Sequence, residues 1–482
     1  MRVCLINPPR IHPKLWGKPS VFQPLEIAYI AAVLEKNSHK VRVIDAPTEG
    51  WRNLEDIGGL KYRQGLRNEE IAAMVKDWSP DMVGVTVPFS GWWVSINEVI
   101  SAVKEVNKDT TTLLTGLHPS VRPKECLEDR NIDFAVVGEP EETVAELADV
   151  LEQGKDPEKV RGLGFVRDGK TIITPPRPLI KDLDSLPFPA RHLLPMKEYF
   201  AAVKENPLRG EISKPWSMMI TSRGCPHQCV FCTIHNVMGR AWRGRSPQNV
   251  VAEIEQLVHT WAVKQIDFFD DNMTLDKKRA AEIFDLIVQK DLHIEWFTPN
   301  GVRADTLDEP LLRKMKASGC KKIRIAPESG VQRVVDQVIK KNQKLTDVEK
   351  AVVLARKVGI RVGCFFVMGL IGETKGEMEQ TIAYAYKLRK LGADRFYFSI
   401  AMPEYGSELY DQAVKGGYLK ETFSDSSLAE IEPLIETPDF TPEEVRELCA
   451  KAHLINHAIT SEKVFKAIRD PKRAVKFLLG KP

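Results

Sequence analysis

The stretch "TSRGCPHQCVFCTIHN", residues 221–236, places Cys225, Cys229 and Cys232 in one short segment near the middle of the chain. The spacing is Cys-x-x-x-Cys-x-x-Cys. Three thiols spaced in this way are compatible with a zinc site, with part of a disulfide framework or with an iron–sulfur cluster. The remainder of the sequence discriminates among these three interpretations.

The other cysteines are scattered singly along the chain, which argues against a disulfide framework and for a reducing cytoplasmic location. The net charge is +3, with 28% charged residues, so no strong preference for nucleic acid is implied. No apolar run is long enough to span a bilayer, and "MRVCLINPP" resembles a core strand rather than a signal peptide. The disulfide interpretation is therefore the weakest, and a metal site remains.

A chain of 482 residues is too long for one ordinary core. In residues 1–150, short β-branched runs alternate with amphipathic helical stretches, which predicts a doubly wound, Rossmann-like parallel sheet. Residues 151–200 are expected to form a hairpin, with Asp168-Gly169 as its turn, followed by a proline-rich connector. From 201 to 403 six strand–helix repeats predict a partial (β/α)6 barrel, and 404–482 a helical region that caps its mouth.

Ligands bind outside the carboxyl ends of the strands in both kinds of sheet. In the first segment these ends carry "NPPR", "VPFSGWW", "TGLHPS" and "GEPEET". In the second, the cysteine stretch follows the first strand, and "DDNMT", "GVRAD", "PESG" and "MGLIGET" follow later ones. No Gly-x-Gly-x-x-Gly follows the first strand, so a dinucleotide is disfavoured.

Structural zinc is usually held by four ligands from two separated pairs, and the chain has no second Cys-x-x-Cys. His227 and His235 can complete a tetrahedron, but both lie in the same short stretch. Thiolates bind the irons of iron–sulfur clusters, and three cysteines leave one iron of a cubane open. An open iron can bind a substrate or cofactor, so the pattern favours a reactive cluster.

At this point the sequence resembles a known family. "RGCPHQCVFC", with "IDFFDDNMT", "GVRAD", "ESG", "GLIGET" and "PEYGSELY", resembles the radical S-adenosylmethionine (SAM) enzymes. The first segment and "DLDSLPFPARHLLP" resemble their cobalamin-binding subgroup, the class B radical SAM methyltransferases. The resemblance implies a 4Fe–4S cluster, SAM and cobalamin as cofactors, and a low-potential electron donor such as ferredoxin or flavodoxin.

The resemblance also implies roles for residues of the barrel. Cys225, Cys229 and Cys232 would bind the cluster. The expected SAM-binding residues are Phe231 beside the adenine, Asp270 and Asp271 near the amino group, Arg303 near the carboxylate, Glu328 and Ser329 at the ribose, and Gly369 and Gly372 along the adenine. Simpler interpretations stay open: the aspartates can cap the next helix, Arg303 can form a surface ion pair, and the glycines can serve only a tight turn.

In the first segment the Asp-x-His-x-x-Gly cobalamin signature is missing, and the position reads "NPPRIHPKLWG". His12 has the wrong spacing, so we expect no histidine on the lower face of cobalt. The expected cobalamin-binding residues are Asn7 and Pro8 after the first strand, Trp92 beneath the corrin, and Gly116, His118, Gly138 and Glu139 along the nucleotide tail. Ordinary packing is an equal alternative for Trp92 and Trp93, and His118 can be a satisfied turn histidine.

Three functional hypotheses follow. The first is a methyltransferase: the 5′-deoxyadenosyl radical abstracts hydrogen from an unactivated carbon, which then receives a methyl group from methylcobalamin. The substrate would be a peptide residue, such as a glutamine of methyl-coenzyme M reductase, or a small molecule. The second is a cyclase or rearrangement enzyme that resembles the anaerobic porphyrin cyclases, and the third is a zinc-stabilised binding protein without catalysis.

The C-terminal helix pattern "TPEEVRELCAKAHLINHAIT" begins with a capping box formed by Thr441 and Glu444. Cys449, His453 and His457 recur every four residues on it, a spacing at which neighbours can share a metal. All three cannot do so, because the outer two lie about 12 Å apart along a helix axis. We therefore expect a polar flank beside the apolar stripe that ends at Ile459.

Overall fold

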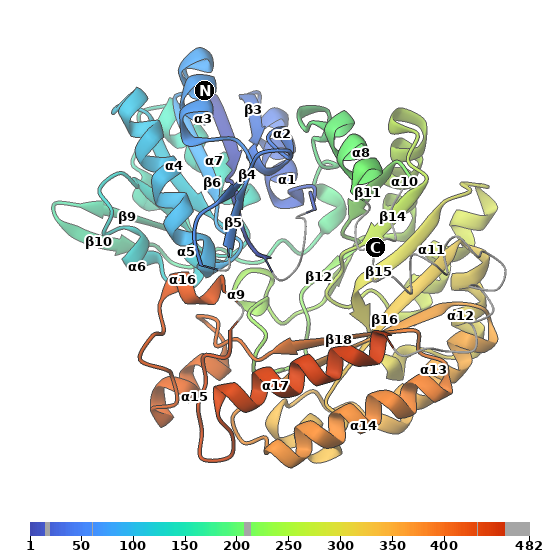
Figure 1. The fold of residues 1–482 in the computed structure, drawn as a ribbon. Helices are drawn as coiled ribbons and strands as arrows, with labels where there is room; N and C mark the ends of the chain where they lie inside the picture. The colour runs from blue at the N-terminus through green and yellow to red at the C-terminus, as the bar shows by residue number, and fades with distance from the viewer. Residues whose placement is uncertain (15–19, 60, 207–213, 431, 458–482) are drawn as a thin grey trace.

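The computed structural model describes residues 1–14, 20–59, 61–206, 214–430 and 432–457. Two large sheets dominate it, one of seven strands and one of six, which lie beside each other in Figure 1. Helices cover both faces of the first sheet and one face of the second. The predicted α/β class is confirmed.

The first sheet has the order β10-β9-β8-β7-β6-β1-β3. Its five parallel strands are β1 (Arg2–Asn7), β3 (Lys40–Asp45), β6 (Met82–Thr86), β7 (Thr111–Thr115) and β8 (Phe134–Val136). The chain moves from β1 to β3 on one side and then returns to β6 on the other, so the switch point lies between β1 and β6. The doubly wound sheet predicted from the sequence is confirmed.

Side chains of β1 alternate between two apolar cores. Val3 and Leu5 pack with helices α1 (Leu25–Lys36) and α7 (Glu141–Glu152), whereas Cys4 and Ile6 pack on the opposite face. The helices of that opposite face are α3 (Asn68–Trp78) and α4 (Trp93–Val106). A strand covered on both faces must be apolar throughout, which explains the continuous run "VCLI".

The hairpin around Asp168-Gly169 forms as predicted from β9 (Leu163–Arg167) and β10 (Lys170–Ile173). Both turn residues have positive φ, 51° and 73°, as a type I′ turn requires. The hairpin pairs antiparallel with β8 and so extends the first sheet, whereas the sequence order groups it with the connector. A small sheet of β2 (Arg10–Pro13), β5 (Lys61–Gln64) and β4 (Leu54–Asp56) was not predicted.

The second sheet is all parallel and open, in the order β11-β14-β15-β16-β17-β18, which confirms the partial barrel. Its strands are β11 (Trp216–Met219), β14 (Gln265–Phe268), β15 (Glu295–Val302), β16 (Cys320–Glu328), β17 (Arg361–Met368) and β18 (Arg395–Ile400). The helices on its outer face are α10 (Pro247–Trp261), α11 (Lys277–Gln289), α12 (Glu309–Ala317), α13 (Leu345–Lys357) and α14 (Lys375–Leu391).

The C-terminal region contributes α15 (Glu408–Gly416), α16 (Asp425–Leu428) and α17 (Pro442–His453). The predicted capping box of Thr441 and Glu444 is present at the start of α17. Helix α17 packs on β18 and α14, and α16 packs on the 3-10 turn Ser90–Trp92 of the first sheet. The tail thus contacts both domains, and predictions for residues 458–482 lie outside the described part of the chain.

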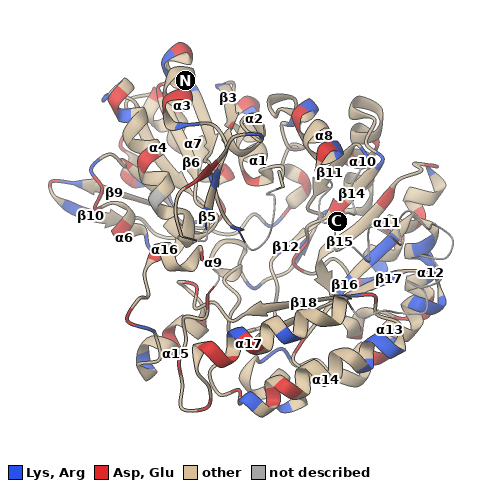
Figure 2. Ribbon diagram, viewed as in Figure 1, with Lys and Arg blue, Asp and Glu red and all other residues tan. Residues whose placement is uncertain are grey.

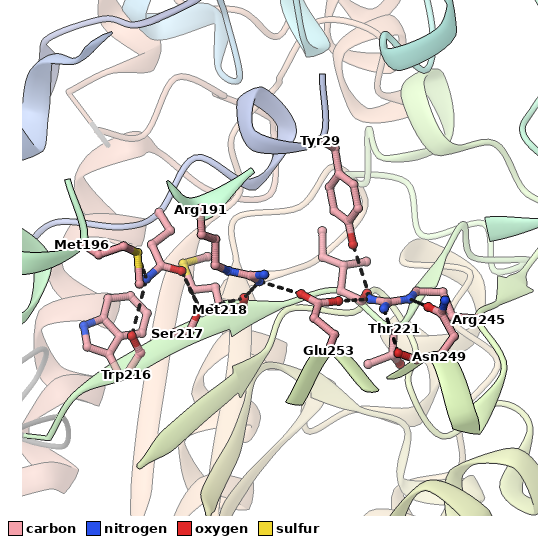
Figure 3. A network of polar contacts seen from close by, with 12 residues as sticks. Tyr29, Arg191, Met196, Trp216, Ser217, Met218, Thr221, Arg245, Asn249 and Glu253 are labelled. Carbon is pink, nitrogen blue, oxygen red and sulfur yellow. Dashed lines mark hydrogen bonds and ion pairs between the residues drawn. The ribbon is translucent and has the colours of Figure 1, made fainter. Parts of the chain in front are cut away.

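The proline-rich connector is fastened to the barrel through Arg191 (Figure 3). The guanidinium donates to the carbonyl of Met218 at 2.7 Å and pairs with the Glu253 carboxylate, also at 2.7 Å. Glu253 lies on α10 and pairs on its other side with Arg245, which also donates to Tyr29 of α1. These buried contacts join the connector, the barrel and the first domain.

Charged residues of both signs are interspersed along the outer helices, as Figure 2 shows for α13 and α14. Among the described helices, none is both long enough and apolar enough to span a bilayer. The remaining short helices are α2 (Ala46–Glu49), α5 (Leu117–Val121), α6 (Pro123–Cys126), α8 (Met196–Glu205) and α9 (His235–Met238).

Candidate functional site

The three cysteines lie in the loop between β12 (Ser222–Arg223) and α9, and their thiols are free and half-buried. The N–H of Cys232 donates to the carbonyl of Cys229 at 3.0 Å, which closes a turn between the last two thiols. Between them, Val230 donates to Ile339 and accepts from Leu409. The barrel and the start of α15 therefore fix this cysteine loop from two sides.

The donor set of three thiols fits a cluster better than a single ion. Among the described residues, the one group of at least three potential ligands whose atoms all lie within 4.8 Å is His39, Asp149 and Glu152, so at least one pair of the three cysteine sulfurs lies further apart than that. Four ligands on one zinc ion at 2.3 Å would bring the sulfurs to about 3.8 Å from one another. Three thiols without a fourth cysteine beside them in the sequence fit a 4Fe–4S cubane with one iron left open.

Gly224 opens the cysteine loop in a conformation that favours glycine. Its φ is +81°, and a Cβ would lie 2.4 Å from the carbonyl oxygen of Ala241. Its N–H donates to the carboxylate of Asp271 at 3.1 Å. Any larger residue here would displace the first cysteine.

The two predicted aspartates differ in what they contact. The buried Asp270 carboxylate accepts from the N–H and hydroxyl of Thr221 and from the hydroxyl of Ser222, at 2.6 to 2.8 Å. Among the described residues, Asp271 accepts from Gly224 alone, and burial, followed by the charge of Asp270, raises the pKa of Asp271 to about 6. Neither caps the next helix, because Asp276 does so. Asp270 anchors the cysteine loop, whereas Asp271 retains acceptor capacity next to it.

Arg303 is buried and pairs with Asp305, and it also donates to the carbonyls of Lys341 and Asn342. The ion-pair alternative for Arg303 thus stays open, because Asp305 is exposed, although the guanidinium itself is buried and also bonds two backbone carbonyls. Lys341 in turn pairs with Glu328 at 2.7 Å. The pair lies close enough to the cysteine loop for the lysine charge to lower the pKa of Cys229, which burial raises overall.

The remaining predicted residues of the barrel line the same edge. Glu328 ends β16 with φ +65°, and the buried Ser329 hydroxyl bonds Thr381 at 3.0 Å. Gly369 and Gly372 both have positive φ, and a Cβ on Gly369 would lie 3.1 Å from Val445 of α17. Phe231 packs half-buried against the barrel core.

In the first domain, the residues at the carboxyl end of β1 are buried. Asn7 donates to Asp45 at 2.6 Å, and Asp45 also accepts from the hydroxyl of Tyr199 in α8. Pro8 is buried beside it. The amide nitrogen of Asn7 thus helps to join β1, β3 and the connector.

Trp92 lies half-buried at the end of β6, next to the exposed ring of Phe89 at 5.4 Å. The Arg10 guanidinium lies 5.3 Å from the Trp92 ring centroid. Trp93 instead packs against His118, with ring centroids 4.8 Å apart. Phe89, Trp92 and Arg10 form a platform of which Phe89 is the exposed part, and Trp93 is half-buried like Trp92 and packs on the same core.

His118 is almost fully buried, and its Nδ1 lies 2.9 Å from the Ser90 hydroxyl. Burial lowers its pKa to about 4. Tyr405 of the tail covers its other side at 6.3 Å. His118 is thus a satisfied packing histidine, and Gly116 before it needs φ +103° to pass the carbonyl of Val87.

Gly138 and Glu139 follow β8 and differ sharply in their surroundings. Gly138 has φ +89° and borders open space, since a Cβ there would meet no heavy atom within 4 Å. The Glu139 carboxylate is buried and accepts from Arg223 and Arg243, both beside the cysteine loop. Glu139 therefore joins the two domains, and Gly138 leaves room for a ligand.

Sequence reasoning missed Arg223, Arg243 and Lys341, which are buried cations around the cysteine loop. Only Arg223 had a signal in the sequence, because it directly precedes Gly224 and Cys225. In the tail, Cys449 is buried with its sulfur 3.7 Å from that of Met368, and the His453 ring bonds the backbone carbonyl of Cys449. These contacts fit the packing interpretation of that helix, and the side chain of His457 lies outside the described residues.

Comparison with known proteins agrees with this geometry. The radical SAM superfamily model matches residues 219–385, and the B12 binding domain model matches residues 19–148. These matches and the two sheets define a radical SAM enzyme with a cobalamin-binding domain. Its cofactors are a 4Fe–4S cluster, SAM and cobalamin, and enzymes of this class need a reductant.

Curated relatives cover almost the whole chain. An uncharacterized methyltransferase of Pyrococcus horikoshii is 31% identical over 94% of this chain and 92% of its own length. The cytidylyl-2-hydroxyethylphosphonate methyltransferase of Streptomyces wedmorensis is 32% identical, over 90% and 86%. The anaerobic magnesium-protoporphyrin IX monomethyl ester cyclase of Rubrivivax gelatinosus is 27% identical, over 86% and 70%. The chain therefore belongs to the cobalamin-dependent radical SAM methyltransferase family.

Among solved structures, the radical SAM methyltransferase TsrM of Kitasatospora setae, with cobalamin and a 4Fe–4S cluster bound, has a similar fold. The TM-score is 0.69 at 18% identity, and the match covers 89% of this chain and 84% of that one. This similarity supports the arrangement of a cobalamin-binding domain followed by a partial barrel.

Proposed function

We propose that this enzyme transfers a methyl group from methylcobalamin to an unactivated carbon of its substrate after hydrogen abstraction. The observation that carries the proposal is the position of the cysteine loop. It lies at the carboxyl end of the barrel, and Arg223 and Arg243, on either side of it, bond Glu139 and Glu141 of the cobalamin domain. When bound, the cluster and SAM supply a carbon-centred radical, and cobalamin supplies the methyl group.

The protein's own part is to bind and to exclude water. Cys225, Cys229 and Cys232 hold the cluster, and Asp270 fixes their loop through Thr221 and Ser222. Asp271 and the Lys341–Glu328 pair offer charges beside that loop for the polar groups of SAM. Phe231, Arg303, Ser329, Gly369 and Gly372 complete the SAM site.

On the cobalamin side, the platform of Phe89, Trp92 and Arg10 supports the corrin ring, and the opening above Gly138 admits the nucleotide tail. His118 is not available to ligate cobalt, because Ser90 and the rings of Trp93 and Tyr405 enclose it. We therefore propose that cobalt has no histidine on its lower face. The absence of nitrogen hyperfine splitting in the Co(II) electron paramagnetic resonance spectrum would support this assignment.

The substrate reaches the site between the two sheets and the tail. Similarity to the phosphonate methyltransferase favours a small molecule as the first candidate, and a glutamine-containing peptide is the second. The 27% identity to the porphyrin cyclase supports one alternative reaction, a cyclisation without methyl transfer. A ferredoxin or flavodoxin is the proposed electron donor.

The test uses anaerobically reconstituted enzyme with a chemical reductant and SAM labelled in its methyl group. Cytidylyl-2-hydroxyethylphosphonate, a glutamine peptide and magnesium-protoporphyrin monomethyl ester are supplied in parallel. Labelled product with one 5′-deoxyadenosine and one S-adenosylhomocysteine per turnover supports methyl transfer to carbon. Product formed with deoxyadenosine but without label supports cyclisation and contradicts the proposal.

A further inference from the structure

A buried network of two carboxylates and two guanidiniums connects the domains. Glu139 accepts from Arg223 at 3.1 Å and from Arg243 at 2.8 Å, and Glu141 accepts from Arg223 at 2.6 Å. All four side chains are at most 8% exposed. We call these four residues the Glu139 bridge.

The Glu139 bridge joins more than two segments. Glu139 also accepts from the N–H of Ile180 in the connector at 2.8 Å. Arg243 donates to the carbonyl of Ile180 and to that of Met238, the last residue of α9. One carboxylate thus fixes the loop after β8, the connector, and the two short strands on either side of the cysteine loop, β12 and β13 (Arg243–Gly244).

The ends of the bridge lie next to the two proposed cofactor sites along the chain. Glu139 directly follows Gly138, which borders open space at the carboxyl edge of the first sheet. Arg223 directly precedes Gly224 and Cys225, where the cysteine loop begins. A shift of either loop must therefore move the other or break a buried ion pair, which is unfavourable because it leaves a buried charge without its partner.

We propose that Glu139 couples the two cofactor sites, so that cobalamin binds more tightly to the protein that carries its cluster, and the cluster is held more firmly when cobalamin is present. The two effects must be equal in binding free energy, because coupling between sites is reciprocal. This inference rests on the proposed positions of the cluster and of cobalamin. It adds that neither site reaches its full affinity alone.

The experiment measures the dissociation constant of hydroxocobalamin by its visible spectrum, with cluster-free and with cluster-loaded full-length protein. For the wild type we expect the cluster to tighten cobalamin binding about fivefold or more, the lower end of usual coupling energies. We call the dissociation constant of the cluster-free protein divided by that of the cluster-loaded protein the coupling ratio. In Glu139→Gln the coupling ratio should fall to near one. In the wild type we expect the cluster to resist an iron chelator better when cobalamin is bound. In Glu139→Gln the resistance should be the same with and without cobalamin.

Glu253→Gln is the matched control. Glu253 is also a buried carboxylate between two arginines, but it joins α10 to Arg191 of the connector and to Arg245, which lies just before α10. The substitution Glu253→Gln should destabilise the protein but leave the coupling ratio at its wild-type value. If Glu139→Gln does not fold, the double variant E139Q/R243Q removes one charge of each sign and answers the same question.

The outcomes separate this inference from the proposed function. Wild-type protein that binds both cofactors with a ratio near one overturns the coupling alone, as does a wild-type ratio in the folded Glu139 variant. Loss of the ratio in Glu253→Gln as well overturns the specific role of Glu139. Wild-type protein that binds no corrinoid overturns the proposed site and, with it, this inference.

Discussion

Two buried carboxylates of this protein have almost the same chemistry and different surroundings. Glu253 lies between Arg191 and Arg245 and is enclosed by the connector, α1 and α10 (Figure 3). Glu139 lies between Arg223 and Arg243, next to the open space at Gly138. The first holds the architecture together, whereas the second connects segments that border cofactors. A buried ion pair is therefore assigned a function by what it joins and not by its own geometry.

The largest effect is expected for the cysteine loop itself. Replacing any one of Cys225, Cys229 or Cys232 by alanine should abolish reductive SAM cleavage, because the cluster loses one of its three protein ligands. Iron per chain after reconstitution and 5′-deoxyadenosine formation are the measurements. Cys449→Ala is the control. The Cys449 thiol is buried against Met368, so the variant protein should keep its full iron content. Full iron content in a loop variant would contradict the cluster assignment.

The two carboxylates should differ in stability. Glu253→Gln leaves Arg191 with one carbonyl partner, so we expect a loss of about 3–5 kcal/mol in the free energy of unfolding. Glu139→Gln leaves Arg223 paired with Glu141 and Arg243 bonded to two carbonyls, so the expected loss is smaller, about 1.5–3 kcal/mol. Urea denaturation of both variants measures the difference. The reverse order would show that the Glu139 bridge is the main structural joint.

The His118 region should make stability depend on pH. Burial lowers its pKa to about 4, below its value in the unfolded chain, so the unfolded state binds a proton first as the pH falls. The contribution is complete above about pH 6.5 and is lost toward pH 4, at about 1.4 kcal/mol per pH unit. His118→Asn should flatten this part of the stability curve. If the free energy of unfolding of the variant depended on pH as steeply as that of the wild type, other titrating groups would be responsible for the dependence.

The smallest effect distinguishes two glycines with open surroundings and positive φ, Gly138 and Gly169. Alanine at either position should cost about 1 kcal/mol of stability, because the left-handed conformation is strained. Only Gly138→Ala should also weaken hydroxocobalamin binding, since its added methyl group enters the opening that we assign to cobalamin. Gly169 lies in the β9–β10 turn and is the matched control. Equal cobalamin affinity in both variants would contradict the assignment of the nucleotide tail to the opening at Gly138.

Local patterns were sufficient for much of the fold. Continuous apolar runs identified the strands of both sheets, and the capping box at Thr441 identified the start of α17. The Asp168-Gly169 turn was also correct, but its partner strand was not predictable, because pairing with β8 depends on which edge remains free. The small β2-β5-β4 sheet has no alternation strong enough to be noticed.

For the candidate site, the sequence alone determined the cysteine loop, its place after the first barrel strand, and the carboxyl edges where cofactors bind, because these follow from residue order and strand direction. Only the tertiary structure decided which polar residues face a ligand and which hold the protein together. Asp270, Arg303, His118 and Glu139 all proved to have protein partners. The physical reason is that a buried charge or ring must be satisfied, and its partners come from segments far away in the sequence.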